Sequence, residues 1–135
     1  MAFDQAIGTM TVYCEASGAG AEAQLAVAYS LMNRLAAGRY GATVAEVCLR
    51  RYQYSEWLPD AGDNADLLRA ARVPDGDLVL QACAQALAQA LSGAAPDPTG
   101  GATHYYGTNI AAPAWTRGAT ETCQIANLIF YKDVQ

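Results

Sequence analysis

The sequence has few basic residues, a single histidine and no long apolar run. Eight Lys and Arg residues against thirteen Asp and Glu give a net charge of −5 and a pI near 4.6. Such a chain repels polyphosphates, so we expect no nucleic acid partner. No apolar stretch has the length that a bilayer crossing needs, so we also expect no stable membrane insertion.

Metal-site and export signals are missing as well. One histidine and four scattered cysteines, with no C-x-x-C pair, lack the spacing of a zinc site, so we expect no metal and no cofactor. Asp4 stands where a secretory signal carries Lys or Arg, which predicts synthesis in the cytoplasm without a signal peptide. The cysteines are then small core residues, although an even count leaves disulfides open, with three possible pairings.

The length fits a single unit. A chain of 135 residues buries a sizeable core without disulfide or metal staples. No internal repeat and no linker interrupts it, so we expect one domain over residues 1–135, acting as a monomer.

What the sequence does contain is helical periodicity with recognisable ends. Apolar residues recur at helical spacing over about 3–14 and 21–37, and Gly38 ends the second run. Thr43 and Glu46 form a capping box that predicts a helix over 44–50. Asn64 and Asp77 open two more helices, over 64–71 and 77–92. Two glycines after Glu15 place that residue at or near the end of the first helix.

The remaining segments are not helical. Residues 51–63 hold two tyrosines, a tryptophan and a proline without a regular period, which predicts an ordered aromatic loop. Residues 102–107 and 125–131 are rich in aromatic and β-branched residues, which predicts two short strands. The predicted fold is therefore α+β, mostly helical, with a small C-terminal β element.

Four clusters of polar and aromatic residues stand out from the alanine-rich background: Glu15 before its glycines, and residues 53–57, 103–106 and 113–115. Aromatic rings pack against the apolar faces of sugars, and amides and hydroxyls bind the ring substituents. A carboxylic acid among aromatic side chains can have its pKa raised by desolvation, as the acid catalyst of glycoside cleavage requires. We interpret the clusters as one glycan-binding site.

Six short motifs cover most of the chain. They are Tyr13-Cys14-Glu15-Ala16-Ser17-Gly18, Val27-Ala28 with Asn33-Arg34, Gln53-Tyr54-Ser55-Glu56-Trp57, Ala102-Thr103-His104-Tyr105, Pro113-Ala114-Trp115 and Phe130-Tyr131. In this order and with these gaps the chain resembles the cell wall hydrolases related to the spore-cortex-lytic enzyme of endospore formers. The resemblance implies a lysozyme-like fold, Glu15 as catalytic residue, and lytic transglycosylase activity on the MurNAc-GlcNAc linkage of peptidoglycan glycan strands.

The resemblance also guides the substrate contacts. We assign these to Gln53, Tyr54, Ser55, Trp57, His104, Tyr105, Tyr106 and Trp115. His104 is expected to line the groove rather than to catalyse. One of Tyr105 and Tyr106 should point inward, because neighbours on a strand face opposite sides. Without a wall-binding repeat or an export signal, the chain is expected to be a compact phage endolysin, or its relic in a bacterial genome, that acts on the cell wall after another agent releases it.

Five positions depart from the family pattern. Ser17 stands for an arginine, Ala19 for a glutamate, and Tyr106 and Leu128 for histidines, while Glu56 is an additional residue in the third motif. The family element has no acid at this last position, so we expect Glu56 to face solvent.

Other functions stay open. A non-catalytic peptidoglycan-binding or phage structural module would keep the groove without the reaction, and loss of turbidity in purified walls would exclude it. A two-carboxylate muramidase would hydrolyse the same bond and would leave reducing ends. An amidase or peptidase is disfavoured, because these enzymes need zinc ligands or a Cys-His pair.

Overall fold

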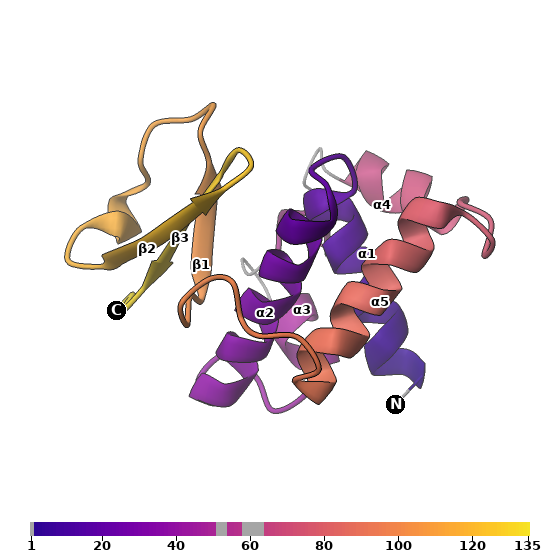
Figure 1. Ribbon diagram of the computed structural model, residues 1–135, viewed down its shortest axis with the longest axis horizontal. Coiled ribbons are helices and arrows are strands. Elements are labelled where there is room, and N and C mark those ends of the chain that lie inside the picture. The colour runs from indigo at the N-terminus through magenta and orange to yellow at the C-terminus, as the bar shows by residue number, and fades with distance from the viewer. Residues whose placement is uncertain (1, 51–53, 58–63) are drawn as a thin grey trace.

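The computed structural model describes residues 2–50, 54–57 and 64–135. A group of helices occupies one side of the molecule and a small sheet the other (Figure 1). The helices are α1 (Ala2–Ala16), α2 (Ala21–Ala37), α3 (Val44–Leu49), α4 (Asn64–Ala71) and α5 (Leu78–Ser92). The strands are β1 (His104–Gly107), β2 (Thr120–Ile125) and β3 (Leu128–Lys132), and η1 (Ser55–Trp57) and η2 (Ala114–Thr116) are 3-10 turns.

The helices begin and end where local signals predict. Gly38 follows α2 with a φ of 80°, a left-handed conformation that glycine adopts without strain. The Oγ1 atom of Thr43 accepts a hydrogen bond from the Glu46 backbone N–H at 3.1 Å and caps α3. Asp77 caps α5 in the same way through the N–H of Leu80, at 2.9 Å. These helix predictions are confirmed.

The sheet is antiparallel with strand order β1-β3-β2. The two predicted strands correspond to β1 and β3. The prediction missed β2, whose sequence Thr-Glu-Thr-Cys-Gln-Ile is mostly polar, because one face of this edge strand is exposed. In the pairing of β1 with β3, Tyr105 lies opposite Phe130, and both rings face the helices.

The core has two parts. The larger part joins α1, α2 and α5 to the inner face of the sheet, where Ile125, Leu128 and Phe130 are buried. The smaller part lies between α2 and α3 and includes Leu31 and Tyr54. None of the described helices is long and apolar enough to span a bilayer.

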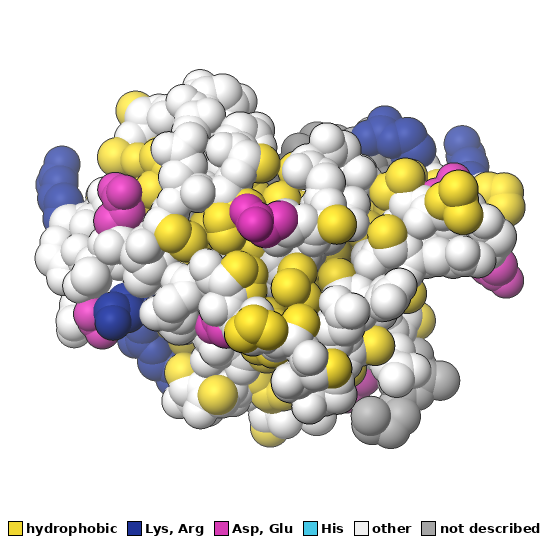
Figure 2. All heavy atoms as spheres, in the orientation of Figure 1, with side chains coloured by type: hydrophobic (Ala, Val, Ile, Leu, Met, Phe, Trp, Pro, Cys, Tyr) yellow, Lys and Arg dark blue, Asp and Glu magenta, His cyan; other side chains and the backbone are white. Residues whose placement is uncertain are grey.

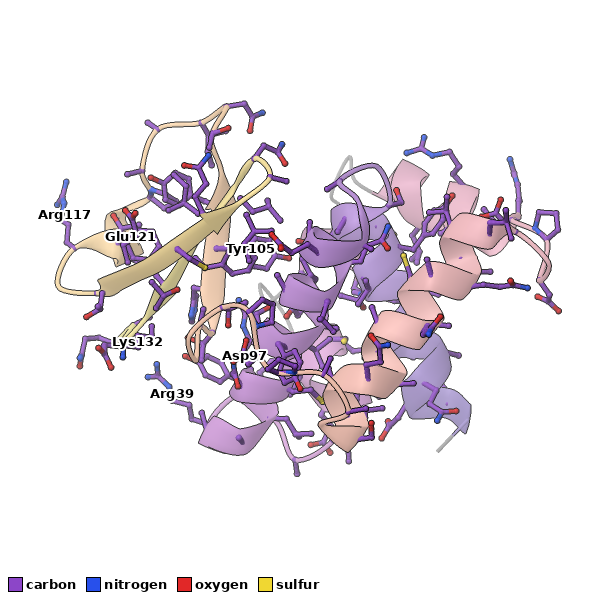
Figure 3. The ribbon with its side chains drawn as sticks, in the orientation of Figure 1. Arg39, Asp97, Tyr105, Arg117, Glu121 and Lys132 are labelled. Atoms are coloured by element: carbon purple, nitrogen blue, oxygen red, sulfur yellow. The ribbon has the colours of Figure 1, made fainter. Side chains whose placement is uncertain are left out.

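The Asn33-Arg34 motif of α2 fastens the segment that leads into the sheet. Asn33 Nδ2 donates to the backbone oxygen of Ala102 at 2.9 Å and to Asp97 Oδ2 at 3.0 Å. Arg34 Nε donates to the backbone oxygen of Thr103 at 2.5 Å. Figure 3 shows Asp97 in the loop between α5 and β1, close to α2. The motif therefore sets the position at which β1 begins.

The Asp97 carboxylate accepts further hydrogen bonds from within this loop. These come from the N–H and hydroxyl of Thr99 at 2.8 and 2.7 Å, and from the N–H of Gly101 at 3.2 Å. Partial burial acts to raise the pKa of Asp97, but the hydrogen bonds from Asn33, Thr99 and Gly101 outweigh it and hold the pKa below its usual value.

We expect Asp97→Asn to destabilise the protein at neutral pH by about 1 kcal/mol, a modest loss because water screens this half-exposed group. The native pKa of Asp97 is depressed, so its stabilisation is complete above the unfolded pKa, about 3.9, and is lost as the pH falls through the native pKa. Thermal unfolding from pH 7 downwards checks this. The two melting temperatures should converge in acid, and a constant difference would contradict the assignment.

Candidate active site

Glu15 lies in the last turn of α1, as the glycines after it predict. The helix ends at Ala16, and Gly20, with a φ of 92°, stands immediately before α2. The turn between them is closed by a hydrogen bond from the N–H of Ala19 to the Ala16 oxygen at 3.1 Å. The half-buried Glu15 side chain therefore projects from a fixed helix end.

Two cavities meet at Glu15. One, of about 420 Å³, lies towards the sheet, and its wall includes Tyr106, Pro113 and Trp115. The other, of about 500 Å³, lies along the α1–α2 turn and the β2–β3 turn, with Ser17 and Asn127 in its wall. Both are lined by Glu15 and by the preceding residue, Cys14. We call the two cavities together the groove, and the Glu15 carboxyl group lies where they adjoin, a position from which it could act on a bond of a bound polymer.

Tyr105, on β1, holds the Glu15 carboxyl group from the side of the sheet. Its hydroxyl donates a short hydrogen bond to Glu15 Oε1, and its ring packs on Phe130 at 5.3 Å. Figure 3 shows the Tyr105 side chain reaching from β1 towards the helices. Burial, followed by the charge of Glu15, raises the pKa of Tyr105 well above its usual value. The hydroxyl therefore keeps its proton and remains a donor to Glu15.

A buried polar residue on α2, which the sequence did not indicate as part of the site, supports the end of the helix that carries Glu15. Gln24, with an exposed fraction of 4%, donates from Nε2 to the backbone oxygens of Ala16 and Ser17, both at 3.4 Å. These are oxygens that the end of α1 leaves without helical partners. In the sequence, the only indication that Gln24 is buried is its place as a polar residue within the apolar stripe of α2.

Tyr106 and Trp115 lie in the wall of the groove, whereas His104 does not line either cavity. The three rings form a layer on the outer face of the sheet, with Trp115 5.2 Å from His104 and 6.1 Å from Tyr106. Burial, then the charges of Arg34 and Arg39, lowers the pKa of His104 to about 4. His104 is therefore neutral near pH 7 and supports Trp115. Tyr105 points inward and Tyr106 outward, the split that strand geometry predicts.

The third motif supplies core residues. Tyr54 is only 3% exposed and lies under the Arg34 guanidinium, 4.9 Å from the ring centre. Trp57 packs against the same core and donates from Nε1 to Thr11 Oγ1 at 2.9 Å. Neither lines the groove beside Glu15, so we reassign both from substrate contact to packing. Gln53 and the side chain of Ser55 lie outside the described residues.

Glu56 does not lie where the sequence predicts. The expectation that it faces solvent is wrong: its exposed fraction is 2%, and it lines the 420 Å³ cavity together with Glu15. The physical reason is the anchoring of its neighbours. With Tyr54 and Trp57 both held in the core, the 3-10 turn between them directs Glu56 into the molecule. Among the residues that the structure describes, two carboxyl groups therefore line this cavity.

The surface gives no sign of a polyanion site on the face seen in Figure 2. Lys and Arg side chains lie at its margins, while apolar and acidic side chains lie in its middle. Among residues 2–50, 54–57 and 64–135, no group of three His, Cys, Asp or Glu side chains gathers to hold a metal ion. The cavity beside Glu15 is lined by two carboxyl groups, by three aromatic rings, and by Cys14, Gly107, Ile110, Pro113 and Leu128.

Residues 18–131 match the sequence model of the cell wall hydrolase family. The chain belongs to this family. The matched range begins three residues after Glu15, so the role of that residue rests on the geometry above and on the motif around it. The enzyme is thus one that degrades the peptidoglycan of the cell wall.

Solved structures share the fold. The catalytic domain of the Bacillus cereus SleB protein has a TM-score of 0.76 at 24% identity, covering 98% of this chain and 91% of that one. The catalytic domain of a germination-specific lytic transglycosylase, SleB from Bacillus anthracis, has a TM-score of 0.73 at 25% identity, covering 96% and 93%. No curated protein matches the chain significantly. The predicted lysozyme-like, mostly helical α+β fold is confirmed.

Proposed function

We propose that the enzyme cuts the glycan strands of peptidoglycan between MurNAc and GlcNAc as a lytic transglycosylase, with Glu15 as acid and then base. The observation that carries the proposal is the position of Glu15 at the junction of two cavities, held by Tyr105. A similar structure, that of Bacillus anthracis SleB, bears the name lytic transglycosylase. Aromatic residues on the sheet side of the groove suit the apolar faces of sugar rings.

The reaction needs one proton carrier. The Glu15 carboxyl group donates its proton to the glycosidic oxygen as the bond from that oxygen to C1 of MurNAc breaks. The C6 hydroxyl of the same MurNAc then attacks C1, and its proton passes to the Glu15 carboxylate, which restores the acid. No water is consumed. Because the nucleophile belongs to the same sugar, the step has the advantage of an intramolecular reaction.

Tyr105 is a positioning residue in this scheme. Its hydroxyl holds one oxygen of Glu15, which leaves the other to face the glycosidic oxygen. A carboxyl group fixed in this way loses less freedom when it reaches the geometry of proton transfer.

We expect purified sacculi digested by the enzyme to yield muropeptides with 1,6-anhydromuramoyl ends. Mass spectrometry of the fragments checks this, because an anhydro end lacks the elements of one water relative to a reducing end. A digest containing only new reducing muramic acid ends would overturn the transglycosylase proposal. Release of free stem peptides without glycan cleavage would overturn glycan cutting altogether.

A further inference from the structure

The second carboxyl group of the groove has no role in the scheme above. Glu56 shares the 420 Å³ cavity with Glu15 and is nearly closed to bulk solvent. Burying a carboxyl group is costly, and glutamate is seldom found so deep in a protein without a reason. A buried acid that lines a reaction cavity is a candidate for chemistry there.

The segment that carries Glu56 is attached to the helix that carries Glu15. The Trp57 indole N–H donates to Thr11 Oγ1 at 2.9 Å, and this hydroxyl donates in turn to the Ile7 oxygen at 2.8 Å. Thr11 is fully buried and lies one helical turn before Glu15 on α1. The two carboxyl groups are therefore supported from one rigid element, as a catalytic pair requires.

The charges of both Glu15 and Glu56 affect the pKa of the buried Tyr54 hydroxyl. Burial is the main reason for the raised pKa of Tyr54. Arg34 opposes the rise, and the charges of both Glu15 and Glu56 add to it. The guanidinium of Arg34, 4.9 Å from the centre of the Tyr54 ring, brings positive charge to the same region. A buried cation nearby offsets part of the cost of placing two carboxyl groups beside the same cavity.

Glycosidases that hydrolyse their substrates place two carboxyl groups at the scissile bond, one as acid and one to act on water or on C1. We propose that Glu56 is the second of these groups and gives the enzyme a hydrolytic branch beside transglycosylation. This inference rests on the proposed function, since both branches begin with proton donation by Glu15.

Hydrolysis begins with the same proton transfer as transglycosylation. Glu15 donates its proton to the leaving glycosidic oxygen, and the bond from C1 of MurNAc to that oxygen breaks. The Glu56 carboxylate takes a proton from a water molecule in the cavity, whose oxygen bonds to C1 and leaves a reducing MurNAc end. Glu56 then carries the proton that Glu15 has lost, and exchange with solvent restores both groups. The branches differ in the oxygen that reaches C1 and in the carboxylate that takes the proton from it.

The test measures the ratio of the two kinds of end. Sacculi are first reduced with borohydride to remove existing reducing ends, digested, and then reduced with borodeuteride. Deuterium marks each hydrolysed end, and the anhydro ends are counted in the same spectrum. The digests compare the wild-type enzyme with Glu56→Gln, Glu56→Asp and a control, Glu22→Gln, whose residue is exposed and lines neither cavity.

We expect the wild-type enzyme to give both kinds of end. Glu56→Gln should lower the ratio of deuterated to anhydro ends at least about tenfold, since a positioned general base contributes a factor of 10² or more. Glu56→Asp should keep part of the ratio and Glu22→Gln all of it. Partial unfolding of a variant reduces both products together and leaves the ratio unchanged.

Three results would overturn the inference: no deuterated ends from the wild-type enzyme, an unchanged ratio in Glu56→Gln, or an equal fall in the control. Each of these leaves transglycosylation by Glu15 intact. Failure of the proposed function would look different, because anhydro ends would then be absent from the wild-type digest itself.

Discussion

Glu15→Gln should abolish lysis of purified walls, with a loss of about 10²–10⁴-fold in rate, because an amide cannot donate the proton that the glycosidic oxygen needs. The change is nearly isosteric. The amide oxygen still accepts the hydrogen bond from the Tyr105 hydroxyl, so the contact between α1 and β1 is kept. Circular dichroism and the melting curve should therefore remain close to those of the wild-type enzyme. Turbidity loss and released muropeptides measure the activity.

The matched control is Glu121→Gln, an exposed carboxyl group on β2 outside both cavities, which should retain full activity. Substantial lysis by Glu15→Gln would assign proton donation to another group. Glu56, the other acid of the cavity, would be the first candidate.

Phe130→Ala should cost about 3–5 kcal/mol of stability, the range for truncating a fully buried aromatic ring. Phe130 has no exposed surface and is the largest fully buried side chain among the described residues. It lies on β3, the central strand, and packs against the ring of Tyr105. Its loss opens a cavity between the sheet and the helices and removes the support of the residue that holds Glu15. Urea unfolding gives the change in free energy.

Phe3→Ala is the comparison, because that ring is 64% exposed and its truncation should change the stability by no more than about 0.5 kcal/mol. If the two variants lost similar amounts, the sheet would not be part of the cooperative core. In that case wall lysis would also survive Phe130→Ala at temperatures at which the wild-type enzyme works.

The helices could be predicted because their signals are local. The period of the apolar residues, the cap at Thr43 and the glycine after α2 lie within each element and need no knowledge of the rest of the chain. The place of Glu15 at a helix end could be predicted from Gly18 and Gly20, whereas its expected catalytic role came from the family motif around it. The strand β2 was missed because its identity depends on pairing with β3 and not on its own polar sequence.

The site was harder to predict where it depends on which way a side chain points. Glutamate is usually a surface residue, yet Tyr54 and Trp57 on either side of Glu56 are anchored in the core and turn its side chain inward. The partnership of Glu15 with Tyr105 joins residues far apart in the sequence. Motif order shows that such residues belong to one site, but the pairing of their atoms follows only from the packed structure.

The strand order β1-β3-β2 also makes the assembly of the sheet depend on β3, the last of the three strands along the chain. The central strand is the last of the three to leave the ribosome, and β1 and β2 pair only with it and not with each other. A chain that ends before β3 lacks Phe130, so it cannot pack Tyr105 against that ring and bring the Tyr105 hydroxyl to Glu15. We therefore expect Tyr105 to be held at Glu15 only after residues 128–132 have emerged from the ribosome and paired with β1.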